Sequence, residues 1–203
     1  MVRAVFFDIG ETLVNETRAW TRAAERLGVP PLTLFGVLGG LIERREPHVG
    51  VLDLLGIERS SWSWPGYGPD DFYPDAFPCL RALREDGYVL GLVGNQPESC
   101  ETFLRDAQLD VDCIASSASW GVAKPSLEFF RRVIETAGCA PHEVAYVGDR
   151  VDNDVVPAAD AGMVAVFIRR GPWGYLQASW PETARAHIRL DSLAELPEAL
   201  RRD

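Results

Sequence analysis

The feature that most constrains the fold is a regular alternation of short apolar runs with stretches of helical period. Strands that alternate with helices in this way form a mostly parallel sheet with helices on both faces. The sequence therefore predicts a doubly wound, mostly parallel α/β sheet. Six apolar runs bounded by turn residues are the predicted strands: Ala4–Phe7, Tyr88–Val93, Val111–Ala115, Val144–Val147, Val164–Ile168 and His187–Leu190. The predicted helices between them are Cys79–Glu85, Pro97–Ala107, Pro125–Ala137 and Pro157–Ala161.

One segment interrupts this alternation, between the first and second predicted strands. An amphipathic helix is predicted at Thr17–Leu27, a second helical stretch at Pro30–Leu41 and a third at Val49–Leu55. A loop rich in Trp, Gly and Pro follows, and includes Trp62 and Trp64. We expect residues 15–75 to form a small helical insert, and residues 1–14 and 76–203 to form the sheet domain.

Composition and charge exclude several classes of function. The formal charge of −10 would repel nucleic acid, and no basic patch overrides it. No apolar run reaches the roughly 18 residues of a membrane span. The stretch Val2–Ile9 is too short for a signal peptide and carries Asp8. The four cysteines lie far apart without a metal-binding pair. A reduced, cytoplasmic protein is expected to have such cysteines.

Polar motifs follow three of the predicted strands, at the sheet edge where ligands bind in folds of this kind. Asp8 follows the first strand, Gly94-Asn95 the second and Gly148-Asp149 the fourth. Another motif, Lys124-Pro125, stands at the start of a helix, and this lysine is the only one beside 19 arginines. A coding bias towards arginine explains such a ratio. The alternative is a site that needs a compact ammonium, because a planar guanidinium differs in size and hydrogen-bond geometry.

In their order, spacing and strand context, these motifs resemble the four sequence motifs of the haloacid-dehalogenase superfamily. The quoted segments are Phe6–Leu13, Leu92–Asn95, Lys124-Pro125 and Val147–Asp154. The resemblance covers nearly the whole chain, and the insert stands where that family has its helical C1-type cap. It implies a Rossmann-like core, a Mg²⁺ cofactor and hydrolysis of a small phosphorylated metabolite.

The resemblance also implies a role for each motif residue. Asp8 is the expected nucleophile, which attacks phosphorus and forms an aspartyl-phosphate. The expected Mg²⁺ ligands are Asp8, Asp149 and the main-chain carbonyl of Gly10, since this hard ion takes oxygen ligands. Phosphoryl transfer depends on positioning and on neutralisation of negative charge. The remaining expected roles are neutralisation by Lys124, contacts to the phosphoryl oxygens from Thr12 and Asn95, and orientation of the metal shell or of Lys124 by Asp154.

Two positions depart from the pattern of the family's phosphatases. Gly10 stands where they carry a second Asp that serves as general acid and base, and Gly94 stands where they carry Ser or Thr. Loss of a positioned acid–base group costs about 10²–10⁴ in rate. Glu11 is a poor substitute, because neighbouring side chains at a strand end point in different directions. The insert residues that are candidates to supply the proton instead are His48, Glu46 and Asp53.

Three functions remain after these departures. The first and preferred one is a phosphatase that acts on good leaving groups or takes its acid from the cap. The second is a haloacid dehalogenase, whose halide needs no proton; the acidic cluster at Gly148–Asp154 disfavours it, because dehalogenases need no metal. The third is a non-enzymatic member that binds a phosphorylated ligand or a protein. A phosphonate-cleaving enzyme is excluded because the insert contains no lysine. Substrate and oligomeric state are left open by the sequence.

Overall fold

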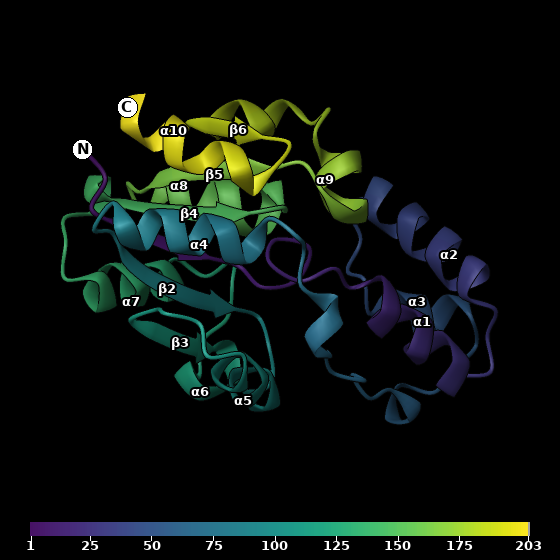
Figure 1. The fold of residues 1–203 in the computed structure, drawn as a ribbon. Coiled ribbons are helices and arrows are strands. Elements are labelled where there is room, and N and C mark those ends of the chain that lie inside the picture. The colour runs from purple at the N-terminus through teal and green to yellow at the C-terminus, as the bar shows by residue number, and fades with distance from the viewer. Residues whose placement is uncertain (203) are drawn as a thin grey trace.

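The computed structural model describes residues 1–202 and confirms the predicted fold class (Figure 1). One sheet of six parallel strands has the order β3-β2-β1-β4-β5-β6. The strands are β1 Ala4–Phe7, β2 Val89–Gly94, β3 Cys113–Ser116, β4 Val144–Gly148, β5 Val164–Ile168 and β6 Ile188–Leu190. All six predicted strands are present, with ends that differ from the prediction by two residues at most.

Helices cover both faces of this sheet, and alternate residues of the central strand face opposite layers. Val5 and Phe7 pack in one apolar cluster, whereas Ala4 and Phe6 pack in the other. Such burial on both faces is what a parallel sheet requires. The first cluster includes α4 Ala76–Glu85, α5 Glu98–Asp106 and α10 Leu196–Arg202, and the second includes α7 Leu127–Ala137 and α8 Val156–Asp160.

The shorter elements complete the sheet domain. A π-helical turn at Val151–Val155 joins β4 to α8, and α6 is formed by Ser117–Trp120. Another short helix, α9, spans Gly171–Gln177 after β5. Short 3₁₀ turns lie at Pro141–Glu143, Pro181–Arg185 and Leu193–Glu195 in this domain, and at Arg59–Ser61 and Pro69–Asp71 between β1 and α4. Within residues 1–202, no helix combines the length and apolar character that crossing a membrane requires.

The strand order reverses at β1, which lies between β2 and β4. Ligands of open α/β sheets bind outside the carboxyl ends of the strands at such a reversal. Asp8 follows β1, Asn95 follows β2 and Asp149 follows β4. The topology therefore brings these three side chains to one edge of the sheet.

Residues between β1 and α4 form three helices beyond that edge (Figure 1). The helices are α1 Thr17–Arg26, α2 Pro31–Glu43 and α3 Gly50–Leu54, close to the predicted ranges. They share an apolar cluster that includes Trp20 and Leu38, together with Trp173 of α9. Because α9 belongs to the sheet domain and packs against α2, it connects the two parts.

Arg170 fixes the chain where it enters and leaves this helical segment. Its guanidinium donates to the carbonyl oxygen of Thr12 at 3.0 Å and to both carboxylate oxygens of Asp75 at 3.1 and 2.6 Å. The same group lies 4.1 Å from the ring centroid of Tyr73. Thr12 lies before the first of these helices and Asp75 at the end of the segment, so one side chain holds both connections against the sheet domain.

Candidate active site

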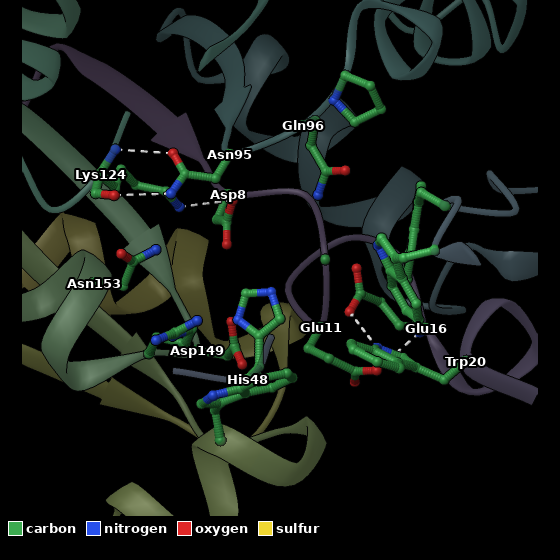
Figure 2. Close-up of a pocket in the computed structure, with 16 residues that line it drawn as sticks. Asp8, Glu11, Glu16, Trp20, His48, Asn95, Gln96, Lys124, Asp149 and Asn153 are labelled. Atoms are coloured by element: carbon green, nitrogen blue, oxygen red, sulfur yellow. Dashed lines mark hydrogen bonds and ion pairs between the residues drawn. The ribbon is translucent and has the colours of Figure 1, made fainter. Parts of the chain in front are cut away.

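Three buried carboxylates and one ammonium group meet at the carboxyl edge of the sheet. The Nζ atom of Lys124 lies 2.8 Å from Oδ1 of Asp8 and 2.6 Å from Oδ1 of Asp154. One carboxylate oxygen from each of Asp8, Asp149 and Asp154 lies within 4.8 Å of the others. Figure 2 shows Asp8, Lys124 and Asp149 directed towards the same space. The structure thus brings together the charged residues that the strand-end motifs single out.

A cavity of about 260 Å³ opens over this cluster, between the sheet domain and the helical segment. Its two sides differ in chemistry. The sheet side carries polar residues, among them Asp8, Gly10, Asn95, Lys124, Asp149 and Asn153. The other side carries aromatic rings, namely those of Trp20, Trp62, Trp64 and Trp173, together with His48. The cavity therefore has a charged side and an aromatic side.

The charges of the cluster do not balance. Burial lowers the pKa of Lys124, but the carboxylates of Asp154 and Asp8 outweigh it and hold this pKa well above its usual range. Burial raises the pKa of Asp149 well above its ordinary value, and the nearby carboxylates of Asp154 and Asp8 add to the shift. The Oδ2 atom of Asp149 is buried and has no hydrogen-bond partner among residues 1–202. One ammonium leaves excess negative charge, which a bound cation would relieve.

Asn95 positions Lys124 through the main chain of that residue. The Nδ2 group of Asn95 donates to the Lys124 carbonyl at 2.9 Å, and the Lys124 N–H donates to Oδ1 of Asn95 at 2.8 Å. Asn95 also lines the cavity, so its predicted contact with phosphoryl oxygens remains a prediction. Thr12 is fully buried and is not among the residues that line the cavity. Its Oγ1 atom has no hydrogen-bond partner within residues 1–202, and its predicted role also remains a prediction.

Two glycines leave room for the acidic side chains. A Cβ atom built on Gly148 would lie 2.3 Å from Oδ2 and 2.5 Å from Cβ of Asp154. A Cβ atom built on Gly94 would lie 2.3 Å from Oδ1 of Asp8. The glycine at position 94, which departs from the family pattern, thus makes space for the Asp8 carboxylate beside Lys124.

Gly148→Ala is expected to lower the rate of the phosphatase reaction that the sequence predicts by about 10²-fold. Displacement of the Asp154 carboxylate by about 1 Å at a reacting centre has an effect of this size. The new methyl group pushes Asp154 away from Lys124 and from the Arg150 N–H, which Asp154 accepts at 3.0 Å. Steady-state kinetics and thermal unfolding measure the effect. Gly36→Ala is the matched control, since this glycine lies in α2 with no atom within 4 Å of an added Cβ. An unchanged kcat in Gly148→Ala would contradict the positioning of Lys124 by Asp154.

Glu16 fills the space beside Gly10. A Cβ atom built on Gly10 would lie 2.2 Å from Oε1 of Glu16. That oxygen accepts a hydrogen bond from the Tyr67 hydroxyl at 2.5 Å, and Oε2 accepts one from Nε1 of Trp20 at 3.0 Å. Burial raises the pKa of Glu16 to about 7, and the carboxylate of Glu11 adds to the shift against those two hydrogen bonds. The sequence patterns did not single out this residue.

The acids suggested by the sequence have different surroundings. Glu46 pairs with Arg44 at 3.0 Å, Asp53 pairs with Arg59 at 2.8 Å, and neither acid lines the cavity. Of the three insert candidates only His48 lines the cavity. Glu11 also lines it, but its Oε1 accepts the Glu16 N–H at 2.8 Å and its Oε2 accepts the Tyr73 hydroxyl at 2.5 Å.

Comparison with known proteins supports a common origin of these motifs. Residues 2–162 match the family model described as haloacid dehalogenase-like hydrolase. A glyceraldehyde 3-phosphate phosphatase of Methanopyrus kandleri is 39% identical over 201 residues, which cover 85% of this chain and 86% of the relative. A glyceraldehyde 3-phosphate phosphatase of Pyrococcus furiosus is 31% identical over 230 residues, which cover 100% of this chain and 94% of the relative.

Two solved structures have the same fold over nearly their whole length. A HAD phosphatase from Thermococcus onnurineus superposes with a TM-score of 0.64 at 25% identity, and covers 98% of both chains. A 2-haloacid dehalogenase from Pseudomonas syringae superposes with a TM-score of 0.63 at 19% identity, and covers 100% of this chain and 99% of that chain. The second likeness concerns the fold alone.

Proposed function

Because this chain belongs to the haloacid dehalogenase-like hydrolases, we propose that it is a phosphatase for a small phosphorylated metabolite. The observation that carries the proposal is the buried contact of Lys124 with both Asp8 and Asp154 beneath the cavity. An ammonium in this place neutralises a phosphoryl group that is attacked by Asp8. The names of the relatives make glyceraldehyde 3-phosphate the first substrate to test.

In the proposed reaction, Asp8 is the nucleophile. Its carboxylate attacks phosphorus as the bond to the leaving oxygen breaks, which forms an aspartyl-phosphate and releases the leaving group. Water then attacks phosphorus, which releases phosphate and regenerates the carboxylate. Lys124 holds the Asp8 carboxylate at 2.8 Å and neutralises charge on the transferring group. Asp154 holds the ammonium at 2.6 Å, and Asn95 fixes the main chain of Lys124, so both are positioning residues.

The residues at this edge are suited to Mg²⁺. Asp149 has a buried oxygen without a partner among residues 1–202, and the carboxylates together exceed the one ammonium in charge. Asp8, Asp149 and the carbonyl of Gly10 are the proposed ligands, since hard cations take carboxylate and carbonyl oxygens. Bound Mg²⁺ would supply positive charge that stabilises the developing negative charge on the phosphoryl group.

The helical segment, residues 15–75, is the proposed cap that selects the substrate. Its aromatic side faces the phosphoryl-binding residues across the cavity (Figure 2). Indole rings of Trp20, Trp62 and Trp64 lie 5.5 to 6.3 Å apart in a contiguous cluster. Aromatic rings contribute contact area and packing geometry to a ligand, so this wall favours substrates whose unphosphorylated part is not highly charged.

A non-enzymatic role is the second candidate, because glycines stand at two polar positions of the family pattern, Gly10 and Gly94. Tight binding of a phosphorylated ligand without turnover would support it. A dehalogenase is disfavoured, since the three clustered carboxylates suit a metal-dependent reaction.

Removal of the metal is expected to abolish phosphatase activity. Purified protein should hydrolyse acetyl phosphate, p-nitrophenyl phosphate and glyceraldehyde 3-phosphate with Mg²⁺, and EDTA should reduce the rates to background. Mg²⁺ should also raise the thermal unfolding temperature, because a ligand at 100 times its Kd stabilises the folded state by about 2.7 kcal/mol. Phosphatase activity that persists in EDTA would contradict the metal site, and metal-independent halide release from a haloacid would establish the dehalogenase function instead.

A further inference from the structure

We propose that Glu16 is the general acid and base of this enzyme, in place of the Asp that Gly10 replaces. The inference rests on the phosphatase function proposed above. It gives the missing proton-transfer group a definite residue, and it makes alkyl phosphates substrates as well as acyl and aryl phosphates. These poorer leaving groups require protonation of the departing oxygen.

The space around Gly10 carries the argument. An added Cβ atom would lie 2.2 Å from Oε1 and 2.7 Å from Cδ of Glu16, so the carboxyl group of Glu16 occupies the volume of a side chain at position 10. Glu16 lines the same cavity as Asp8 and Lys124, and Figure 2 shows it on the side of the cavity next to Trp20. A carboxyl group is therefore present beside Gly10, although it comes from another position in the chain.

The surroundings hold this carboxyl group in one orientation. The Tyr67 hydroxyl donates to one oxygen at 2.5 Å and the Trp20 indole N–H donates to the other at 3.0 Å. The Glu16 N–H is bound by Glu11 at 2.8 Å, which fixes the main chain as well. Only 8% of Glu16 is exposed. Each oxygen accepts one hydrogen bond, which leaves a further acceptor position on each of them.

The proton balance follows from these positions. As the Asp8 oxygen bonds to phosphorus, the bond from phosphorus to the leaving oxygen breaks, and its electron pair stays on that oxygen. The leaving oxygen takes the proton of the Glu16 carboxyl group and departs as an alcohol. The Glu16 carboxylate then takes a proton from water as the water oxygen bonds to phosphorus. The bond between Asp8 and phosphorus breaks, which restores the Asp8 carboxylate and the protonated Glu16.

Other acids at the cavity fit this role less well. The Glu11 side chain packs against Gly171, where an added Cβ atom would lie 2.5 Å from its Cγ and 2.6 Å from its Oε2. His48 lies among the rings of Trp20 and Trp173, with centroids 6.4 and 6.1 Å away, on the aromatic side of the cavity. Apart from its two chain neighbours, the three atoms nearest an added Cβ on Gly10 all belong to Glu16.

Glu16→Gln tests the proposal with a side chain of the same shape that cannot transfer the proton. For the alkyl phosphate that the wild type hydrolyses fastest, kcat/KM should fall by at least about 10²-fold. The first-turnover burst of p-nitrophenolate from p-nitrophenyl phosphate should be retained, because this leaving group departs without a proton. Steady-state turnover of the same substrate should slow, because the aspartyl-phosphate then lacks a base. Glu11→Gln is the matched control at a neighbouring buried carboxyl. It should change the rates on the alkyl phosphate and on p-nitrophenyl phosphate by the same factor.

Exchange of the two positions provides an independent test. Gly10→Asp alone should lower activity, since the new side chain collides with Glu16. The double variant Gly10→Asp with Glu16→Ala should recover alkyl phosphate hydrolysis relative to Glu16→Ala, because the carboxyl group then comes from position 10.

Three results would overturn the proposal and leave the phosphatase function intact. The first is a first-turnover rate that falls by the same factor for both substrates in Glu16→Gln. The second is a Glu11→Gln variant that loses more activity on the alkyl phosphate than on p-nitrophenyl phosphate. The third is a wild type that hydrolyses acyl and aryl phosphates only. A wild type without any burst or turnover would instead remove the phosphatase function, and the role of Glu16 with it.

Discussion

Asp8→Asn is expected to remove phosphatase activity by a factor on the order of 10⁵ or more, since loss of a covalent nucleophile leaves only the binding and electrostatic contributions. The amide has nearly the same size as the carboxylate, but it is neutral and does not attack phosphorus. The wild type quenched during turnover should carry one phosphoryl group, measured by mass spectrometry, which hydroxylamine releases as expected of an acyl phosphate. The variant should carry none.

Folding of this variant should be unaffected. Asp8 is one of three clustered carboxylates, and Lys124 keeps its contact with Asp154 at 2.6 Å when the Asp8 charge is removed. Thermal unfolding therefore separates a chemical loss from a structural one. Asp110→Asn is the control at an exposed position, because the Asp110 side chain is 82% exposed and does not line the cavity. A phosphoryl group on Asp8→Asn, or activity near that of the wild type, would rule out Asp8 as the nucleophile.

Lys124→Met is expected to destabilise the protein by about 3–5 kcal/mol at neutral pH, because it leaves buried carboxylates without their cation. The lysine side chain is 0% exposed, so water cannot take over the role of the ammonium. Phosphatase activity should also fall, by about 10³-fold or more, since the phosphoryl group loses a positioned positive charge. Denaturant unfolding and steady-state kinetics measure the two effects.

The loss of stability in Lys124→Met should depend on pH, and the direction of this dependence can be derived. Burial raises the pKa of Asp154 to about 6 although the Lys124 ammonium lowers it, so removal of the ammonium raises this pKa further. A folded-state pKa above that of the unfolded chain costs stability that returns as pH falls and the group binds a proton. The difference between wild type and Lys124→Met should therefore narrow in acid. A constant difference would contradict the charged cluster.

Lys124→Arg completes the experiment with a change that retains the charge. The guanidinium is larger and planar, and insertion of extra atoms into a fully buried site costs about 1–3 kcal/mol. Most of the charge-dependent stability should be retained. Phosphatase activity should still be lost, since the planar guanidinium does not replace the compact ammonium. Wild-type activity in this variant would favour coding bias as the explanation for the single lysine.

Much of the fold could be predicted from the sequence because its strands are unusually clear. Ala4–Phe7 and Val164–Ile168 are continuous apolar runs, and both predicted ranges agree with β1 and β5. Parallel strands buried on both faces have this pattern. Helices α9 and α10 were not indicated. The first starts with Gly171-Pro172 and the second, Leu196–Arg202, is short, so neither shows a helical period that stands out.

The candidate site was predictable to the extent that strand ends define it. Asp8 and Asp149 come together because β1 and β4 are neighbours in the sheet, which follows from the topology. Glu16 could not be found in this way. It precedes α1, where an acidic residue is favoured by the helix dipole, so its position has an ordinary explanation. Its contact with Gly10 depends on the path of the turn after β1, which the sequence pattern does not specify.

The tryptophans of the cavity wall have a practical consequence. Four of the six in the chain line the cavity, namely Trp20, Trp62, Trp64 and Trp173. Indole emission depends on the polarity and water contact of the ring, and four of the six indole rings lie at the cavity where a ligand is proposed to bind. The molecule therefore contains its own optical reporter of occupancy, and affinities for non-hydrolysable phosphate analogues are accessible by titration without a label.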